Sequence, residues 1–268
     1  MIITVIGAGV IGGAVAKALA KNAVEDHVIA TDYRVEQFFE LEKEGIETTT
    51  NNKKAVAIAD AVILCVKPKD IKTVLAEIRD EVKGKLVLSI AAAVNLEVLK
   101  KHAPEARFVR AMPNLAILAR ESFTAYCVGT DVTNRDKATI RKILGALGTF
   151  VEIEEDKMDA VTALSGCAPG YLASLMESIV KGGIEVGLPA DLALTALAQS
   201  MVGTGRLILD VKKSPAEIMK MVATPGGVTE EELKELEKYP LQKAFQSALQ
   251  AGAEKSRKIS KILAAENE

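Results

Sequence analysis

The chain has 268 residues, of which 49% are hydrophobic and 26% charged, enough to bury one large core or two ordinary ones. Its 34 basic and 36 acidic residues are interspersed and leave a net charge of −2, so no basic field is present to attract a nucleic-acid backbone. Three widely spaced cysteines without a CxxC pair argue against a disulfide framework or a thiolate metal site. We expect a soluble protein of two domains with reduced cysteines, no metal and no nucleic-acid partner.

No secretory pattern precedes the strand-like segment IITVIG that follows Met1, so we expect a cytoplasmic protein. The uncharged run from Ala160 to Met176 contains glycine and proline and is shorter than the ~20 residues of a membrane span. We expect no membrane partner and interpret this run as a buried pair of helices.

The first part of the chain alternates short apolar runs rich in β-branched residues with amphipathic segments, the pattern of a parallel sheet flanked by helices. The predicted strands are 2–6, 27–31, 61–66, 85–90, 107–111, 123–128 and 149–153. The predicted helices between them are 10–22, 35–44, 70–79, 95–102 and 134–147.

The β-rich runs stop after about Asp156, and long segments rich in Ala, Leu and Met follow. The helices predicted there are 157–167, 169–187, 190–211, 214–222, 229–238 and 240–263. The fold class is therefore α/β, with a doubly wound sheet in residues 1–154 and an all-α domain in residues 155–268. The stretch from Leu192 to Gly205 is uncharged and is apolar around most of its circumference, so a helix there needs cover on several sides. We therefore expect a homodimer or higher homo-oligomer formed by the helical half.

A glycine motif opens the first predicted helix. In ITVIGAGVIGGAVAKAL, Gly7, Gly9 and Gly12 have the GxGxxG spacing after a strand, and Val10 and Ile11 lie between the last two glycines. Such glycines permit a tight turn, approach of the backbone to a pyrophosphate, and close packing of helix on strand. This context indicates a Rossmann-type dinucleotide site.

Two charged residues end the second predicted strand. Asp32 follows the motif at the interval of a carboxylate that binds ribose hydroxyls and repels a 2′-phosphate, which favours NADH. Arg34 could instead pair with such a phosphate, or it could be a solvated charge. Both NADPH and NADH therefore stay open as cofactors.

Several segments taken together resemble the pyrroline-5-carboxylate reductase family. They occur in the family's order and span nearly the whole chain: GAGVIGGAVAKAL, CVKPKD, LSIAAAV, VRAMPN, ALSGCAPGY, GLPADLAL and VATPGGVTEEELKELE. The resemblance implies an oxidoreductase with a dinucleotide domain and a helical dimerisation domain. It also implies the last reaction of proline biosynthesis, hydride transfer from NADPH or NADH to the C=N bond of 1-pyrroline-5-carboxylate, giving L-proline. That reaction depends mostly on holding two rings in a near-attack pose.

The resemblance also implies cofactor contacts at the carboxyl ends of strands, where open α/β sheets bind ligands. The residues matched are Asn52, Val66, Lys67 and Pro68. The alternative for Lys67 is an ordinary lysine at a strand end. Met112 and Asn114 match the segment near the nicotinamide, where Asn114 would bind the carboxamide unless it only terminates its strand.

The substrate-binding turn implied by the resemblance is TPGGVT. Its backbone N–H groups would hold the imino acid's carboxylate at a helix N-terminus. The residues expected to do so are Pro225, Gly226, Gly227 and Val228. Thr229 matches the family threonine whose hydroxyl lies beside the imine nitrogen and is the candidate catalytic residue. The structural alternative is a capping box, because Thr229 followed by Glu232 fits T-x-x-E at the start of a helix.

Cys167 takes the place of a family serine at a bend between two predicted helices, and neither histidine lies in its domain to generate a thiolate. We therefore expect a small packed residue near the substrate and not a nucleophile.

Other positions also depart from the family pattern, at Leu115, Ala116, Ala168 and Glu230, so a related cyclic imino acid stays open as the substrate. Two further functions stay open as well, a β-hydroxyacid dehydrogenase-type enzyme and a non-catalytic dinucleotide sensor.

Overall fold

The computed structural model describes residues 1–22 and 27–265. The chain divides into two compact units. Unit 1 contains Met1–Pro169 together with Leu249–Glu268, and unit 2 contains Gly170–Ala248.

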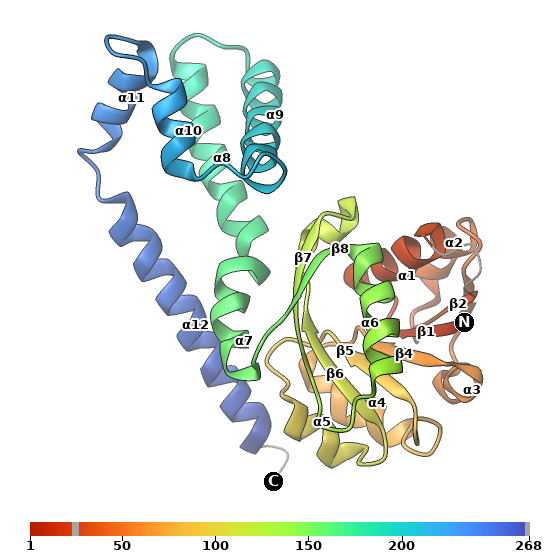
Figure 1. The fold of residues 1–268 in the computed structure, drawn as a ribbon. Coiled ribbons are helices and arrows are strands. Elements are labelled where there is room, and N and C mark those ends of the chain that lie inside the picture. The colour runs from red at the N-terminus through yellow and green to blue at the C-terminus, as the bar shows by residue number, and fades with distance from the viewer. Residues whose placement is uncertain (23–26, 266–268) are drawn as a thin grey trace. The chain divides into compact units, whose positions relative to one another are not determined.

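Unit 1 is built on an eight-stranded sheet with the order β3-β2-β1-β4-β5-β6-β7-β8 (Figure 1). Neighbouring strands are parallel except β6 and β7, which are antiparallel. The strands are β1 Ile2–Ile6, β2 His27–Thr31, β3 Glu47–Thr49, β4 Ala61–Leu64, β5 Leu86–Ser89, β6 Arg107–Met112, β7 Ser122–Val128 and β8 Gly148–Glu152.

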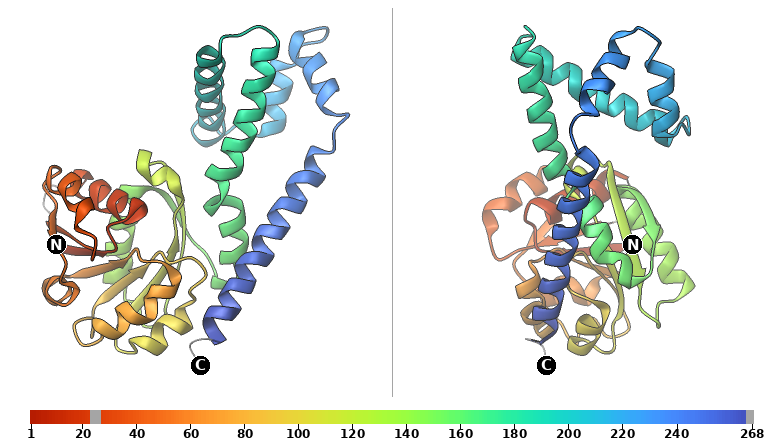
Figure 2. Two further views of the ribbon diagram at one scale, coloured as in Figure 1. Left: turned by 180° about the vertical axis from the view of Figure 1, so that it is seen from behind. Right: turned by 90° about the vertical axis from the view of Figure 1, so that its left-hand side faces the viewer.

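Helices cover both faces of this sheet, because its central strands carry apolar side chains on both sides (Figure 2). In β4, Ala61 and Ile63 belong to one core, and Val62 and Leu64 belong to the other. The first core is completed by α1 Val10–Asn22, α2 Phe38–Glu42 and α6 Asn134–Leu147. The second is completed by α3 Asn52–Ile58, α4 Ile71–Glu77, α5 Leu96–His102 and the end of α12 Leu241–Ala265.

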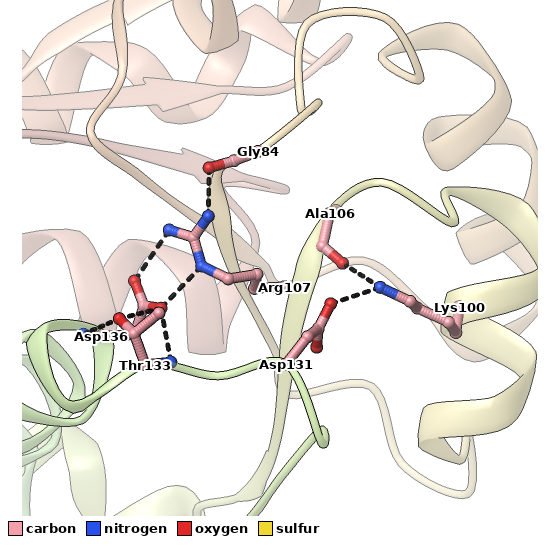
Figure 3. Close-up of polar contacts among 7 residues, drawn as sticks. All are labelled: Gly84, Lys100, Ala106, Arg107, Asp131, Thr133 and Asp136. Atoms are coloured by element: carbon pink, nitrogen blue, oxygen red, sulfur yellow. Dashed lines mark hydrogen bonds and ion pairs between the residues drawn. The ribbon is translucent and has the colours of Figure 1, made fainter.

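An ion pair joins β6 to the start of α6 (Figure 3). The Arg107 guanidinium donates to both carboxylate oxygens of Asp136, at 2.6 and 2.9 Å, and also to the Gly84 carbonyl. Asp136 accepts the Thr133 N–H in a capping box. Burial alone would raise the pKa of Asp136, but Arg107 and Thr133 together lower it to about 2.

Four short 3₁₀ turns connect elements of unit 1, at Val35–Gln37, Pro68–Asp70, Leu115–Ala119 and Glu155–Lys157. After the last of these, α7 Met158–Val161 continues into a π-helical turn at Thr162–Gly166, and α8 Ala168–Glu185 follows.

Unit 2 is all-helical within the described chain. It contains most of α8, then α9 Ala190–Leu209, α10 Pro215–Val222, α11 Val228–Leu236 and the first residues of α12 (Figure 2). Tyr171 and Phe245 meet edge to face with ring centroids 6.3 Å apart. By length and composition alone, α9 is long and apolar enough to cross a membrane, but one such helix is weak evidence for a membrane span. In the single chain, 6% of that stretch is buried.

The predicted α/β class, with a Rossmann-type sheet followed by helices, is confirmed. Three details differ from the expectation. The sequence interpretation missed β3 and α3, and it did not predict that β7 runs antiparallel to β6. The run from Ala160 to Met176 is not a buried pair of helices in the single chain, since α8 has no buried residue there.

Candidate functional site

The glycine turn after β1 has the geometry that its sequence predicts. Gly7 has φ +94°, and a Cβ on it would lie 2.9 Å from the Cys65 carbonyl oxygen. A Cβ on Gly12 would lie 1.8 Å from the Gly7 carbonyl oxygen, so only glycine lets α1 approach the strand this closely. Among the described residues, a Cβ on Gly9 would have only the Arg34 guanidinium within 4 Å, at 3.6 Å. The turn therefore leaves room for a pyrophosphate at Gly9.

Val10 and Ile11 form the first turn of α1, which begins at this opening. Val10 is 68% exposed, whereas Ile11 packs against the core. The first N–H groups of an α-helix have no carbonyl partner within it, and the helix dipole adds partial positive charge there. The start of α1 is thus suited to an anion.

Asp32 and Arg34 form one hydrogen-bonded pair beside the glycine turn. The Asp32 carboxylate, only 3% exposed, accepts the Ala8 N–H and the Arg34 N–H, each at 2.9 Å. It also accepts two bonds from the Arg34 guanidinium, at 3.2 and 3.3 Å. Burial acts to raise the pKa of Asp32, but these donors, above all Arg34, lower it below its ordinary value. The Arg34 charge therefore offsets much of the repulsion that Asp32 would exert on a 2′-phosphate.

The segment that follows β4 meets the glycine turn where the strand order reverses, between β1 and β4, the usual ligand position of open α/β sheets. Val66 follows β4, and its side chain would be 3.0 Å from a Cβ on Gly7. Lys67 is exposed and precedes the turn that Pro68 begins. The Asn52 amide accepts from Thr31 at 2.6 Å and donates to Glu77 at 2.9 Å. Val66 therefore lies beside the glycine turn, whereas Asn52 is bonded to Thr31 at the end of β2.

Asn114 makes contacts that differ from its expected role. Its side-chain oxygen accepts the Ala116 N–H at 3.1 Å, which caps the 3₁₀ turn at Leu115–Ala119. Its amide nitrogen donates to the Ser165 carbonyl, 3.1 Å away in the π-helical turn. Met112 contacts the same turn, since its Cε would lie 2.8 Å from a Cβ on Gly166. Both ends of the Asn114 amide therefore have partners within the protein.

Cys167 ends the π-helical turn and donates its N–H to Thr162. Its side chain is exposed, so the expectation of a packed residue is wrong for the single chain. Its thiol has no hydrogen-bond partner among the described residues. Cys127, in contrast, is buried, and burial raises the pKa of its thiol to about 12.

The TPGGVT segment forms the N-terminal turn of α11. Gly227 is the N-cap, and Gly226 has φ +73°. A Cβ on Gly227 would lie 2.6 Å from the Thr224 hydroxyl oxygen, and the Gly227 N–H donates to the Thr224 carbonyl at 2.9 Å. Thr224 thus borders this turn. The sequence interpretation did not name Thr224 as a site residue, although it directly precedes Pro225.

Two expectations for this turn need correction. Proline has no N–H, so Pro225 cannot donate to a carboxylate as expected. The capping box of Thr229 and Glu232 is also wrong, because the helix begins earlier, at Val228 after the Gly227 cap. Thr229 is the second helical residue, half-buried, and its hydroxyl makes no hydrogen bond within the part of the chain that the structure describes.

The carboxylate that does reach this turn belongs to Glu230. It accepts the Gly226 N–H at 2.8 Å and lies 3.4 Å from the Lys234 ammonium. Among the described residues, no group of three His, Cys, Asp or Glu side chains could hold a metal ion.

The Rossmann-type sheet with its glycine turn, followed by a helical unit, defines a dinucleotide-binding oxidoreductase fold. Residues 155–259 match the model "Pyrroline-5-carboxylate reductase dimerisation", and residues 2–93 match "NADP oxidoreductase coenzyme F420-dependent". The pyrroline-5-carboxylate reductase of Methanosarcina acetivorans is 33% identical, with 96% of this chain and 97% of that protein covered. That of Arabidopsis thaliana is 31% identical, with 94% and 95% covered. The chain belongs to the pyrroline-5-carboxylate reductase family.

Solved structures of pyrroline-5-carboxylate reductases are also similar to this chain. A pyrroline-5-carboxylate reductase from Coxiella burnetii has a TM-score of 0.90 at 30% identity, covering 96% of this chain and 97% of that one. The Plasmodium falciparum pyrroline carboxylate reductase, solved with NADP bound, has a TM-score of 0.85 at 26% identity, with 96% and 97% covered.

Proposed function

We propose that the chain is an NAD(P)H-dependent reductase that converts 1-pyrroline-5-carboxylate to L-proline. The observation that carries this proposal is the free Thr229 hydroxyl in the first turn of α11, in a chain whose glycine turn leaves open space at Gly9. Membership of the family over nearly the whole chain supports the same reaction.

The residues that would hold the dinucleotide fit it. Gly9 and the start of α1 would take the pyrophosphate, and the Asp32–Arg34 pair would meet the adenosine ribose. The other proposed cofactor contacts are Gly7, Val10, Ile11, Gly12, Asn52, Val66, Lys67, Pro68, Met112 and Asn114. When bound, the reduced nicotinamide supplies a hydride.

In the proposed reaction the hydride adds to the imine carbon, the electrons of the C=N bond pass to nitrogen, and the nitrogen carries a proton in the product. The Thr229 hydroxyl would hydrogen-bond this nitrogen and fix the ring's orientation. The Val228 and Thr229 N–H groups, which have no partner among the described residues, would hold the substrate carboxylate at the positive end of α11. Gly226, Gly227 and Cys167 complete the proposed substrate contacts. Positioning supplies most of the rate.

The two parts of the chain would have separate roles. Residues 1–154 are proposed as the dinucleotide-binding domain, and residues 155–268 as the helical domain for substrate binding and dimerisation. Exposed apolar side chains on α8 and α9 support a homodimer, because such residues need cover. They are Leu172, Ile179, Ile184, Leu192, Leu194, Val202, Leu207, Ile208 and Leu209. Three free cysteines suit the reducing cytoplasm, which we propose as its location.

The test is the oxidation of NADPH and of NADH by the purified chain with 1-pyrroline-5-carboxylate, followed by absorbance, with proline identified as the product. Turnover with either cofactor supports the proposal. Tight dinucleotide binding without turnover would contradict it and indicate a sensor.

A further inference from the structure

A carboxylate of the chain itself occupies part of the proposed anion site. Glu230 Oε2 accepts the Gly226 N–H at 2.8 Å, four residues back in the turn that precedes α11. The Lys234 ammonium lies 3.4 Å from the same oxygen. The Gly226 N–H, followed by the charge of Lys234, lowers the pKa of Glu230. Glu230 is therefore an anion at neutral pH, and it is bound where a substrate anion is expected.

Only a few donors surround this point. Pro225 has none, and the Gly227 N–H is committed to the Thr224 carbonyl at 2.9 Å. The Gly226 N–H goes to Glu230. The substrate carboxylate is left with the Val228 and Thr229 N–H groups, unless Glu230 moves away.

Glu230 can leave Gly226 without losing its counter-ion. Its side chain is 37% exposed, and Lys234 is positioned to receive it when it leaves Gly226. A second negative charge arriving at Val228 and Thr229 would repel the resident carboxylate as well as compete for its donor.

Resting on the proposed function, we propose that Glu230 is a specificity-determining residue that competes with the substrate's carboxylate and raises its KM. Substrate binding displaces Glu230 from Gly226 onto Lys234. A cyclic imine without a carboxylate does not need this exchange, so Glu230 reduces the advantage that an anionic substrate has over a neutral one.

The experiment measures KM and kcat for 1-pyrroline-5-carboxylate in the full-length protein and in the variants Glu230→Ala, Glu230→Gln and Glu231→Ala, with 1-pyrroline as the neutral comparison. Glu231 is the matched control. The variant Glu231→Ala removes the same charge one residue along the helix. The Glu231 carboxylate lies 3.9 Å from the Lys234 ammonium and accepts no backbone N–H among the described residues.

We expect Glu230→Ala to lower KM for 1-pyrroline-5-carboxylate by about three- to tenfold, the effect of removing one exposed charge-assisted hydrogen bond that competes with the substrate. Glu230→Gln should lower KM by a smaller factor, since a neutral amide oxygen accepts more weakly. The ratio of KM for 1-pyrroline-5-carboxylate to KM for 1-pyrroline should fall, and kcat should change less than KM.

An unchanged KM in Glu230→Ala, or an equal fall in Glu231→Ala, overturns the proposal. A lower melting temperature without any change in KM also overturns it and reduces Glu230 to a helix cap. Failure of the proposed function is a different result, because then the unmodified chain does not oxidise NADPH or NADH with 1-pyrroline-5-carboxylate.

Discussion

Replacing Arg34 by alanine is expected to move cofactor use from NADPH toward NADH. The Arg34 guanidinium is 3.6 Å from a Cβ position on Gly9 and is held there by two bonds to the buried Asp32 carboxylate. A 2′-phosphate on the ribose would find this guanidinium already oriented. The hydroxyls of NADH would instead use Asp32, whose carboxylate loses its counter-ion in the variant.

The size of the effect follows from the exposure of the pair. The Arg34 side chain is 47% exposed, so its bond to a phosphate is charge-assisted but partly screened by water. We expect Arg34→Ala to lower kcat/KM for NADPH by roughly five- to thirtyfold and to leave kcat/KM for NADH within about threefold. Asp32→Asn should change the ratio in the opposite direction, since it removes the negative charge while keeping an acceptor for the Ala8 N–H.

Steady-state rates with both cofactors at a fixed concentration of 1-pyrroline-5-carboxylate provide the measurement. Lys43→Ala is the matched control. It also removes a half-exposed cation that pairs with a carboxylate, Glu40, at 2.9 Å and lies over an aromatic ring. An unchanged NADPH/NADH ratio in Arg34→Ala, or the same fall in Lys43→Ala, would refute the assignment of Arg34 to the ribose.

Three other predictions follow from contacts in unit 1 and unit 2. Thr229→Ala should lower kcat/KM by roughly ten- to thousandfold and leave the melting temperature nearly unchanged, because Thr229 does not cap α11. Thr229→Ser should restore much of the rate. A fall in melting temperature without loss of rate would count against a substrate contact. Gly12→Ala should abolish dinucleotide binding and lower the melting temperature, since its Cβ would lie 1.8 Å from the Gly7 oxygen; calorimetric titration with NADPH tests this. Asp136, whose pKa is lowered from 3.8 to about 2, should stabilise the fold by about 2 kcal/mol above pH 4 and lose this contribution as the pH falls toward 2. Urea unfolding of the parent and of Asp136→Asn across this range should show curves that converge at low pH, and parallel curves would contradict the role of Arg107.

The long periodic segments could be predicted from the sequence, because their apolar spacing is set by the faces they bury. The strands β1 and β2 and the helices α1 and α6 have the predicted bounds. β3 was missed because three residues, Glu47–Thr49, are too few to show alternation. The direction of β7 is not encoded in apolar pattern at all. It was nevertheless open to inference, since the residues between Met112 and Ser122 are too few for the helical crossover that parallel neighbours need.

At the candidate site, the residues easiest to predict from the sequence were those at positions where the surrounding backbone leaves no room for a side chain. Gly7 and Gly12 could be assigned because no side chain fits there. The alternative of a capping box at Thr229 and Glu232 is wrong, because T-x-x-E also describes an ordinary first turn, and only the backbone angles of Gly227 distinguish the two. The hydrogen bond that the Gly226 N–H donates to Glu230 could not be predicted, since it depends on a glycine with positive φ and on the rotamer of Glu230.

The two outer strands of the sheet also determine how copies of this chain can associate. An uncovered strand edge is a template to which another strand can add. β3 offers only three polar residues, and its Glu47 carboxylate lies 2.6 Å from His27. On β8, the last residue, Glu152, pairs with Lys137 at 3.0 Å and accepts the Tyr126 hydroxyl, which places an ion pair at the end of the other edge. These polar and charged groups disfavour the addition of a further strand at the two margins of the sheet.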